Sequence, residues 1–274
     1  MVITTYEIPY KNGQKFKLRP IFDVHLGNKA CDSRKLRKDI DESDEDTYFL
    51  LGGDVMDSII VKDKRYRKSI DDVDGDPIID RQLARAVEIF EPIKDRIIGI
   101  GSGNHEDAIV INSGTDPTQR LCDALGVSNL GYSGIVRLVF FQKGKKKGMR
   151  GRSRTLMIRW HHGWGGGTRT QGGSITKYSK DVPYWEADLY LYGHDHRLQT
   201  DDVPRMVVKG DRLVAQPRRI CLCGSYLKSY IIGKPSSVTY SEKFGFPPIT
   251  VGGLTVQLSP DNPRDCVGMV PILE

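Results

Sequence analysis

The sequence predicts a mixed α/β fold, and three observations support this. Short apolar runs rich in β-branched and aromatic residues recur along the chain and end in turn residues, as strands do. Segments with helical spacing of apolar residues separate several of these runs, which is typical of α/β proteins. Polar residues of metal-binding type follow the strand-like runs at five places.

The elements are expected as follows. Strands are predicted at Leu18–Val24, Tyr48–Leu51, Arg96–Ile100, Ile135–Phe141, Thr155–Trp160 and Ala187–Tyr192. Helices are predicted at Ser33–Ile40, Ile79–Ile93 and Pro117–Leu125. The strands on either side of the basic segment 143–154 are expected to form a hairpin with that segment at its tip. A second hairpin is expected at Ile249–Val256, turning at Gly252-Gly253.

Residues 1–231 are interpreted as one catalytic domain. Residues 232–274, which are rich in proline and glycine, are interpreted as a β-type extension packed on that domain. The 274 residues are enough for a substantial core. No apolar run approaches the roughly 20 residues of a membrane helix, so no membrane association is expected.

The N-terminal segment lacks the apolar stretch of a secretory signal. Five scattered cysteines do not suggest a disulfide framework, and Cys221 and Cys223 are expected to be buried strand residues rather than metal ligands. A cytoplasmic location is therefore expected.

The net charge of +6 is unevenly distributed. The segment 143–154 (KGKKKGMRGRSR) contains seven lysines and arginines and no acid, whereas 39–46 (DIDESDED) is acidic. The basic segment is either a solvated hairpin tip or a contact for an anionic polymer such as nucleic acid.

Five polar motifs stand where strand-like runs end. They are Asp23-Val24-His25, Gly52-Gly53-Asp54, Gly103-Asn104-His105-Glu106, His161-His162 and Gly193-His194-Asp195-His196. Residues two apart in an extended chain point to the same side, so the D-x-H and H-x-H pairs can each face one ion. Any one motif is easily matched by chance, but chance is a poor explanation for all five in order.

This ordered set resembles the motifs of the calcineurin-like metallophosphoesterases, over about residues 16–226. The resemblance implies a four-layer α/β/β/α sandwich with a two-metal centre at the strand ends. It implies that Asp23, His25 and His196 hold one ion, that Asn104, His162 and His194 hold the other, and that Asp54 bridges them. It further implies hydrolysis by a metal-bound hydroxide that attacks phosphorus in line.

Two divalent ions are therefore expected, with manganese preferred and iron or zinc as alternatives, because the ligand types suit all three. His105 is expected to act as a general acid or to stabilise charge on the leaving group. Asp57, Glu106 and Asp195 are expected to orient other side chains.

Only one of the two adjacent histidines is needed as a ligand. His162 is preferred because it precedes glycine and shares a strand face with Leu156, Ile158 and Trp160, whereas His161 lies on the face of Arg159. The glycine-rich segment that follows is interpreted either as a flexible loop that folds over substrate or as a disordered surface loop.

The substrate is less well specified. The corresponding motif of protein Ser/Thr phosphatases contains an arginine. The motif here is Gly53-Asp54-Val55-Met56-Asp57-Ser58 and has none, so that class is disfavoured. A phosphodiesterase acting on nucleic acid is preferred; a phosphomonoesterase or nucleotide phosphatase, and a metal-binding scaffold without activity, are the alternatives. The expected substrate contacts are His161, Arg169, Lys145, Lys146, Lys147, Arg150, Arg152 and Arg154. Trp164, Tyr178, Tyr184 and Trp185 could stack on bases or simply pack the fold.

Overall fold

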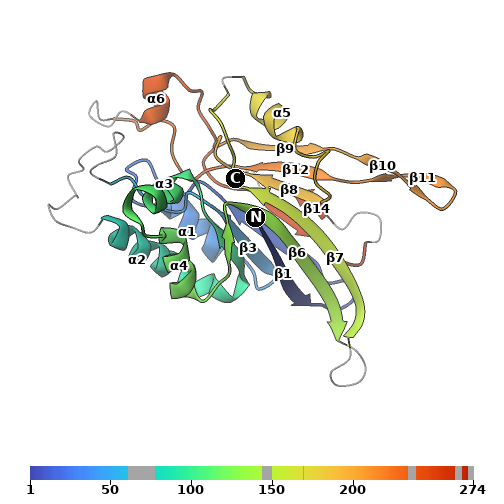
Figure 1. Ribbon diagram of the computed structural model, residues 1–274. Coiled ribbons are helices and arrows are strands. Elements are labelled where there is room, and N and C mark those ends of the chain that lie inside the picture. Colours follow the sequence, from blue (N-terminus) through green and yellow to red (C-terminus); the bar gives the residue numbers. More distant parts are fainter. Residues whose placement is uncertain (61–77, 144–149, 169, 234–238, 263–266, 271–274) are drawn as a thin grey trace.

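The structure is a computed structural model that describes residues 1–60, 78–143, 150–168, 170–233, 239–262 and 267–270. Two six-stranded sheets face each other, and helices cover their outer faces (Figure 1). The predicted four-layer α/β/β/α sandwich is therefore confirmed.

The first sheet combines parallel and antiparallel pairs. Its strands, in spatial order, are β1 (Val2–Pro9), β6 (Ser133–Lys143), β7 (Arg150–His161), β8 (Leu189–Tyr192), β12 (Arg219–Cys223) and β9 (Leu198–Asp202). The second sheet is parallel except at one edge, and its strands are β14 (Val267–Val270), β13 (Thr255–Leu258), β2 (Phe16–Ile21), β3 (Thr47–Gly52), β4 (Ile97–Gly101) and β5 (Asn129–Gly131).

The helices lie mostly on the second sheet (Figure 1). They are α1 (Ser33–Asp41), α2 (Ile78–Phe90) with the 3-10 helix η1 (Glu91–Arg96), α3 (Asn104–Ser113), α4 (Pro117–Leu125), α5 (Gly173–Ser179) and α6 (Tyr240–Phe244). Among them, α5 covers the first sheet through Tyr178, which packs with Tyr190 and Tyr192. No helix in the described ranges is long and apolar enough to cross a membrane.

The main core fills the space between the two sheets and is formed by side chains such as Phe22, Phe140 and Trp160. A second core joins the other face of β3, including Phe49 and Leu51, to α1, α2 and α4. Successive residues of β3 thus point to opposite cores, which explains why its sequence is almost continuously apolar.

The predicted strands all overlap observed ones, and the predicted helix Pro117–Leu125 has the observed bounds. The segment expected as one helix from Ile79 to Ile93 continues past Phe90 as η1, whose first turn contains Pro92. Strands β6 and β7 form the expected hairpin, while residues 144–149 at its tip lie outside the described residues.

The second predicted hairpin is wrong. Gly252 instead bridges to Ser225, and β13 continues the second sheet beside β2. The reason is close packing of the backbone: a Cβ on Gly224 would lie 2.2 Å from the Gly252 carbonyl oxygen. Gly252 itself has a φ of 130°, a backbone conformation that favours glycine, so this glycine serves the bridge to Ser225 rather than a hairpin turn.

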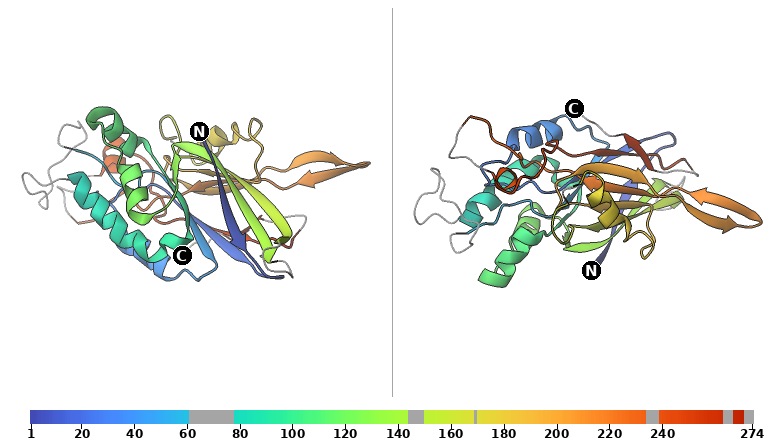
Figure 2. Two further views of the ribbon diagram at one scale, coloured as in Figure 1. Left: turned by 60° about the horizontal axis from the view of Figure 1, so that its bottom comes forward. Right: turned by 90° about the horizontal axis from the view of Figure 1, so that it is seen from above.

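A two-stranded ribbon of β10 (Arg205–Lys209) and β11 (Arg212–Gln216) projects from the first sheet (Figures 1 and 2). Most residues of the ribbon are exposed, and its base adjoins the ends of β9 and β12.

Strand β13, in the C-terminal part of the chain, contributes directly to the main core through Val256 and Leu258. We expect Leu258→Ala to reduce the free energy of unfolding by about 2–5 kcal/mol, because it removes a fully buried side chain. Urea denaturation measures this, and Gln257→Ala, on the opposite face of the same strand, is the matched control. Equal stability of both variants would contradict a structural role for β13 in the core.

Candidate metal centre

The five polar motifs converge at one end of the sandwich. Each follows a different strand: Asp23 and His25 follow β2, Asp54 follows β3, Asn104 opens α3 after β4, His162 follows β7, and His194 and His196 follow β8. The structure thus brings together all seven residues that the sequence predicts as metal ligands.

Local backbone conformation distinguishes these positions. Six non-glycine residues in the described ranges have a positive φ, and five of them belong to the seven: Asp23, His25, Asp54, His194 and His196, with φ between 49° and 70°. A left-handed conformation costs such residues about 1–3 kcal/mol and is found mainly where function demands it. The chain therefore accepts strain in order to point these side chains inward.

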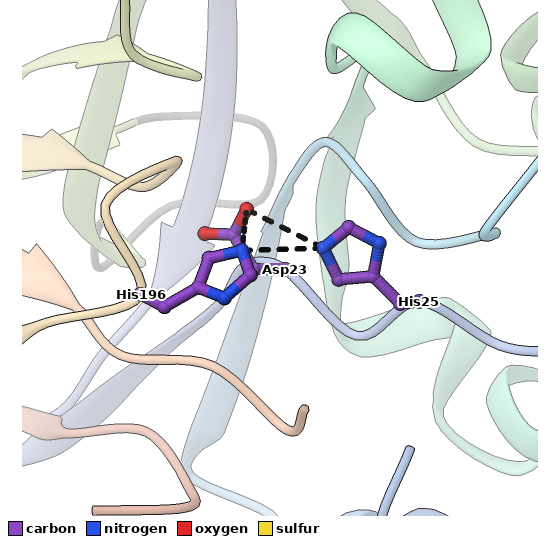
Figure 3. A group of neighbouring side chains, drawn as sticks. All are labelled: Asp23, His25 and His196. Atoms are coloured by element: carbon purple, nitrogen blue, oxygen red, sulfur yellow. Dashed lines mark hydrogen bonds and ion pairs between the residues drawn. The ribbon is translucent and has the colours of Figure 1, made fainter. Parts of the chain in front are cut away.

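One group of ligand atoms is formed by Asp23, His25 and His196 (Figure 3). The His196 Nε2 lies 3.5 Å from Asp23 Oδ1 and 3.3 Å from His25 Nε2, and His25 Nε2 lies 4.0 Å from the same oxygen. Asp23 Oδ1 is buried and has no hydrogen-bond partner. A buried carboxylate oxygen faced by imidazole nitrogens fits a divalent cation.

A second group lies beside the first. His162 Nε2 is 3.4 Å from Asp54 Oδ2 and 3.1 Å from Asn104 Oδ1. His194 Nδ1 is 2.9 Å from the same Asn104 oxygen. Asp54 Oδ2 also lies 3.8 Å from His25 Nε2, so this carboxylate stands between the two groups and can contact an ion in each.

Backbone N–H groups fix the orientation of both carboxylates. Asp23 Oδ2 accepts a hydrogen bond from the His194 N–H at 2.8 Å, and Asp54 Oδ1 accepts one from the His105 N–H at 2.9 Å. Each aspartate therefore turns its other oxygen toward the centre. Such support is what orients ligands in metal sites.

The histidines are held from behind in the same way. The second ring nitrogen of His162 faces the Gly52 carbonyl at 3.0 Å, and that of His194 faces the Gly165 carbonyl at 2.7 Å. The Nδ1 of His25 lies 3.3 Å from Asp57 Oδ1. An N–H directed at each acceptor leaves the inward nitrogen able to bind a cation.

The electrostatics of the centre favour a cation. Burial by itself lowers the pKa of His162, but Asp54 and Asp23 outweigh it and raise this pKa to about 10. Burial opposes ionisation of Asp54, yet the neighbouring histidines hold its pKa well below the usual value. The negative potential that retains a proton here attracts a divalent ion equally.

Glu106 supports the loop that carries Asp54. Its carboxylate accepts hydrogen bonds from the N–H groups of Asp54, Met56 and Gly103, at 2.9–3.0 Å. Burial and the nearby charge of Asp54 raise the pKa of Glu106 to about 7. Its place beneath the loop, not facing the ions, agrees with an orienting role.

His105 lies at the open side of the centre. Its Nδ1 is 2.5 Å from the Asp57 carbonyl oxygen, and its Nε2 lies 4.0 Å from Asp54 Oδ2. The side chain is 13% exposed, against 2% for Asp54. The ring is therefore oriented from below, with its Nε2 toward the site where a substrate would approach.

His161 faces a different environment from its neighbour. Its Nδ1 accepts a hydrogen bond from the Gly163 N–H, and its ring lies 4.9 Å from the Trp164 ring. Burial and the charge of Arg159 lower its pKa to about 4. The structure therefore places His162 among the ligand atoms and turns His161 toward the following loop.

The start of the glycine-rich loop, residues 163–167, is held by hydrogen bonds from a neighbouring helix. Lys177 of α5 donates to the carbonyl oxygens of Trp164 (2.9 Å) and Gly166 (3.4 Å), and it pairs with Asp195 Oδ1 at 2.6 Å. These contacts fix the Gly165 carbonyl that faces His194. One lysine thus joins residues 163–167 to the segment of His194, while the interpretation of the glycine-rich segment as a flexible loop over substrate or as a disordered surface loop stays a prediction.

Lys177 is a residue that sequence reasoning missed. Nothing distinguishes a single lysine in a short helix from a solvated one, and only the folded chain brings it to these oxygens. Tyr178 is fully buried and packs against Trp164, with ring centroids 4.8 Å apart, so Tyr178 presents no stacking surface, whereas Trp164 is 37% exposed.

The expected substrate contacts other than His161 lie far from the centre or outside the described residues. Lys145, Lys146, Lys147 and Arg169 fall outside them, as does the Arg150 side chain. Arg154 precedes His161 by seven strand residues, or roughly 23 Å at the usual rise, and Arg152 lies farther still. These arginines could contact only a substrate that extends well beyond the reacting group.

Similarities to known proteins were also sought. No protein-family model and no curated protein sequence matches the chain. Among solved structures, a metallophosphoesterase from Sphaerobacter thermophilus is 14% identical, with 93% of this chain and 88% of that chain covered and a TM-score of 0.40. Vps29 from Chaetomium thermophilum is 10% identical, with coverage of 89% and 80% and a TM-score of 0.36. The NAD nucleotidase of Haemophilus influenzae is 10% identical, with coverage of 94% and 49% and a TM-score of 0.38.

The two adjacent histidines give a direct test of the ligand geometry. We expect His162→Ala to lose one of two bound ions per chain, because it removes an imidazole from the group around Asp54 and Asn104. Metal content after dialysis against Mn²⁺ measures this. His161→Ala should retain both ions, and the opposite result would reverse the assignment of the pair.

The Lys177 contacts give a second test. We expect Lys177→Met to weaken binding of one ion by about 10–100-fold, the usual effect of losing a residue that orients a ligand. In the metal-free protein, amide exchange over residues 163–167 should also rise. Lys180→Met, exposed one residue beyond the same helix, is the control. Unchanged exchange and affinity in Lys177→Met would show that the loop is held by other contacts.

Proposed function

We propose that the chain is a two-metal phosphoesterase that hydrolyses phosphodiesters, with nucleic acid as its substrate. One observation carries the proposal: two buried carboxylates, four imidazoles and an amide oxygen face one another at the strand ends, with Asp54 between two ligand groups. A metal-binding scaffold without activity would need this centre but would have no use for His105 at its open side.

The residues suit two divalent ions. Asp23, His25 and His196 would hold one, Asn104, His162 and His194 the other, and Asp54 both. Ions so bound would supply Lewis acidity toward a phosphoryl group and lower the pKa of water. Nitrogen and oxygen ligands together suit manganese, our preferred metal, as well as iron and zinc.

Groups of the protein itself would orient the ligands and supply a proton to the leaving group. The carboxylates are held by backbone N–H groups, so they need not reorganise during the reaction. His105, with its Nδ1 held by the Asp57 carbonyl, can deliver a proton from Nε2 to the leaving oxygen. An alkoxide leaves poorly without that proton.

The charge of the centre favours a diester over a monoester. Within the described ranges, no lysine or arginine forms an ion pair with Asp23, Asp54 or Asp57, and Lys177 is engaged by Asp195. With only the described residues around it, a doubly charged monoester would rely on the two ions alone for compensation, whereas a diester carries a single charge. This supports diesterase over the alternative of a monoesterase or nucleotide phosphatase.

Nucleic acid is the polymeric diester that suits the remaining surface. The basic strand β7 places Arg152 and Arg154 far from the metal centre. Only an extended polyanion could contact these arginines and the metal centre at the same time. The free thiols of Cys31, Cys122, Cys221 and Cys223 favour a reducing compartment, and we infer the cytoplasm.

The experiment compares wild type and His105→Ala in Mn²⁺ on DNA, bis-p-nitrophenyl phosphate and p-nitrophenyl phosphate. We expect wild type to cleave both diesters faster than the monoester, and chelation to abolish cleavage. His105→Ala should lower kcat on DNA by about 10²–10⁴-fold, with metal content retained. It should affect the p-nitrophenyl diester much less, because p-nitrophenolate leaves without protonation.

Asp54→Ala is the companion variant and should lose both metal and activity. Rapid monoester turnover with no cleavage of single- or double-stranded DNA would refute the nucleic-acid proposal. Metal binding without hydrolysis of any of the three substrates would favour the scaffold.

A further inference from the structure

A second cavity lies on the outer face of the first sheet, away from the metal centre. Its volume is about 390 Å³, within the range of small-molecule sites. The end of α5, the β9–β10 connection and the start of β12 form its walls. It is lined by Ser179, Val182, Pro183, Val203, Pro204, Arg205 and Arg218.

Arg218 is the unusual residue of this cavity. Its side chain is 3% exposed, and neither Nε nor Nη2 has a hydrogen-bond partner. Its Nη1 donates to the Tyr190 hydroxyl at 3.3 Å. The Nε–H and Nη2–H groups lie on one edge of the guanidinium, the edge that binds a carboxylate or phosphate through two parallel hydrogen bonds.

The described part of the chain compensates the charge of Arg218 only partly, through its interaction with the Asp188 carboxyl. Arg218 forms no ion pair with a carboxylate among the described residues, and the nearby Asp188 accepts a hydrogen bond from the Met157 N–H at 2.9 Å. Burial of an incompletely compensated charge is unfavourable, and native structures rarely leave such donors without partners. Both donors are closed off from solvent in this conformation, so an anion from solution would satisfy them once the guanidinium turns toward the cavity.

The cavity is distinct from the metal centre. Arg219 pairs with Leu189, the first residue of β8, whereas the ligand His194 comes after the last residue of that strand. At the usual rise per residue, the two sites are roughly 15 Å apart along β8.

We propose that this cavity binds a small organic anion, whose phosphate or carboxylate pairs with the Nε/Nη2 edge of Arg218. Rotation of the terminal side-chain bonds of Arg218, which lines the cavity, presents that edge to the ligand. Arg205 at the exposed rim adds a second positive charge, and Val182, Val203 and the two prolines contact an apolar body. This inference does not depend on the proposed phosphoesterase activity.

The test uses the full chain stripped of metal with EDTA and then dialysed free of the chelator, so that neither bound metal nor EDTA carboxylates interfere with the probes. Phenyl phosphate, benzoate and inorganic phosphate are titrated by calorimetry and thermal shift, with phenol as the uncharged match. We expect one equivalent of an aryl anion to bind and to raise the Tm, with no effect of phenol. The aryl probe that binds more tightly identifies phosphate or carboxylate as the preferred group.

Arg218→Met should weaken this binding by about tenfold or more, the value of a charged hydrogen bond. Arg212→Met, an equal change of charge on the exposed β11, should bind as wild type. If Arg218→Met does not fold, Arg218→Lys decides, since it keeps the charge but loses the two-donor edge and should be weakened similarly. No binding of any anion at millimolar concentration, or wild-type affinity in a folded Arg218 variant, would overturn the proposal.

Discussion

The repulsion between two buried carboxylates is the constraint on which this structure depends. Asp23 and Asp54 are both almost fully buried, and each raises the cost of ionising the other. The surrounding histidines outweigh that cost and hold the pKa of both carboxyls below the usual value, yet Asp23 Oδ1 still has no hydrogen-bond partner. Cations are what such an arrangement requires, so the end of the sandwich is built to hold them.

The sheets provide the rigidity that this arrangement needs. Parallel strands of both sheets end at the same edge, so short turns suffice to bring five segments together. Those turns require small residues in close quarters: a Cβ on Gly103 would lie 2.1 Å from Asp54 Oδ1, and one on Gly163 would lie 2.4 Å from the His194 Cβ. Gly103 and Gly163, beside the ligands, therefore allow close packing.

Much of this was predictable from the sequence, for identifiable reasons. Strand ends are marked by abrupt changes from apolar to polar residues, so Asp54 and His194 could be located without coordinates. The preference for His162 over His161 followed from the glycine after it, with support from the alternation of strand faces. The role of Lys177 could not be predicted, because its partners are two carbonyl oxygens and Asp195, which only the tertiary fold gathers. The hairpin predicted to turn at Gly252-Gly253 was wrong for a similar reason, because Gly252 contacts Gly224, which is distant in sequence.

The first sheet links the two sites. His194 follows its strand β8 at one end, while the buried Arg218 directly precedes the partner strand β12 at the other. One end concentrates buried negative charge that calls for cations, and the opposite end isolates a buried positive charge that calls for an anion. Helix α5 adjoins both, since its Lys177 holds the metal-centre loop and Ser179 lines the cavity. An anion in the cavity would therefore contact the same helix that positions His194, which makes metal affinity in the presence of an aryl anion the measurement that would reveal coupling between the two.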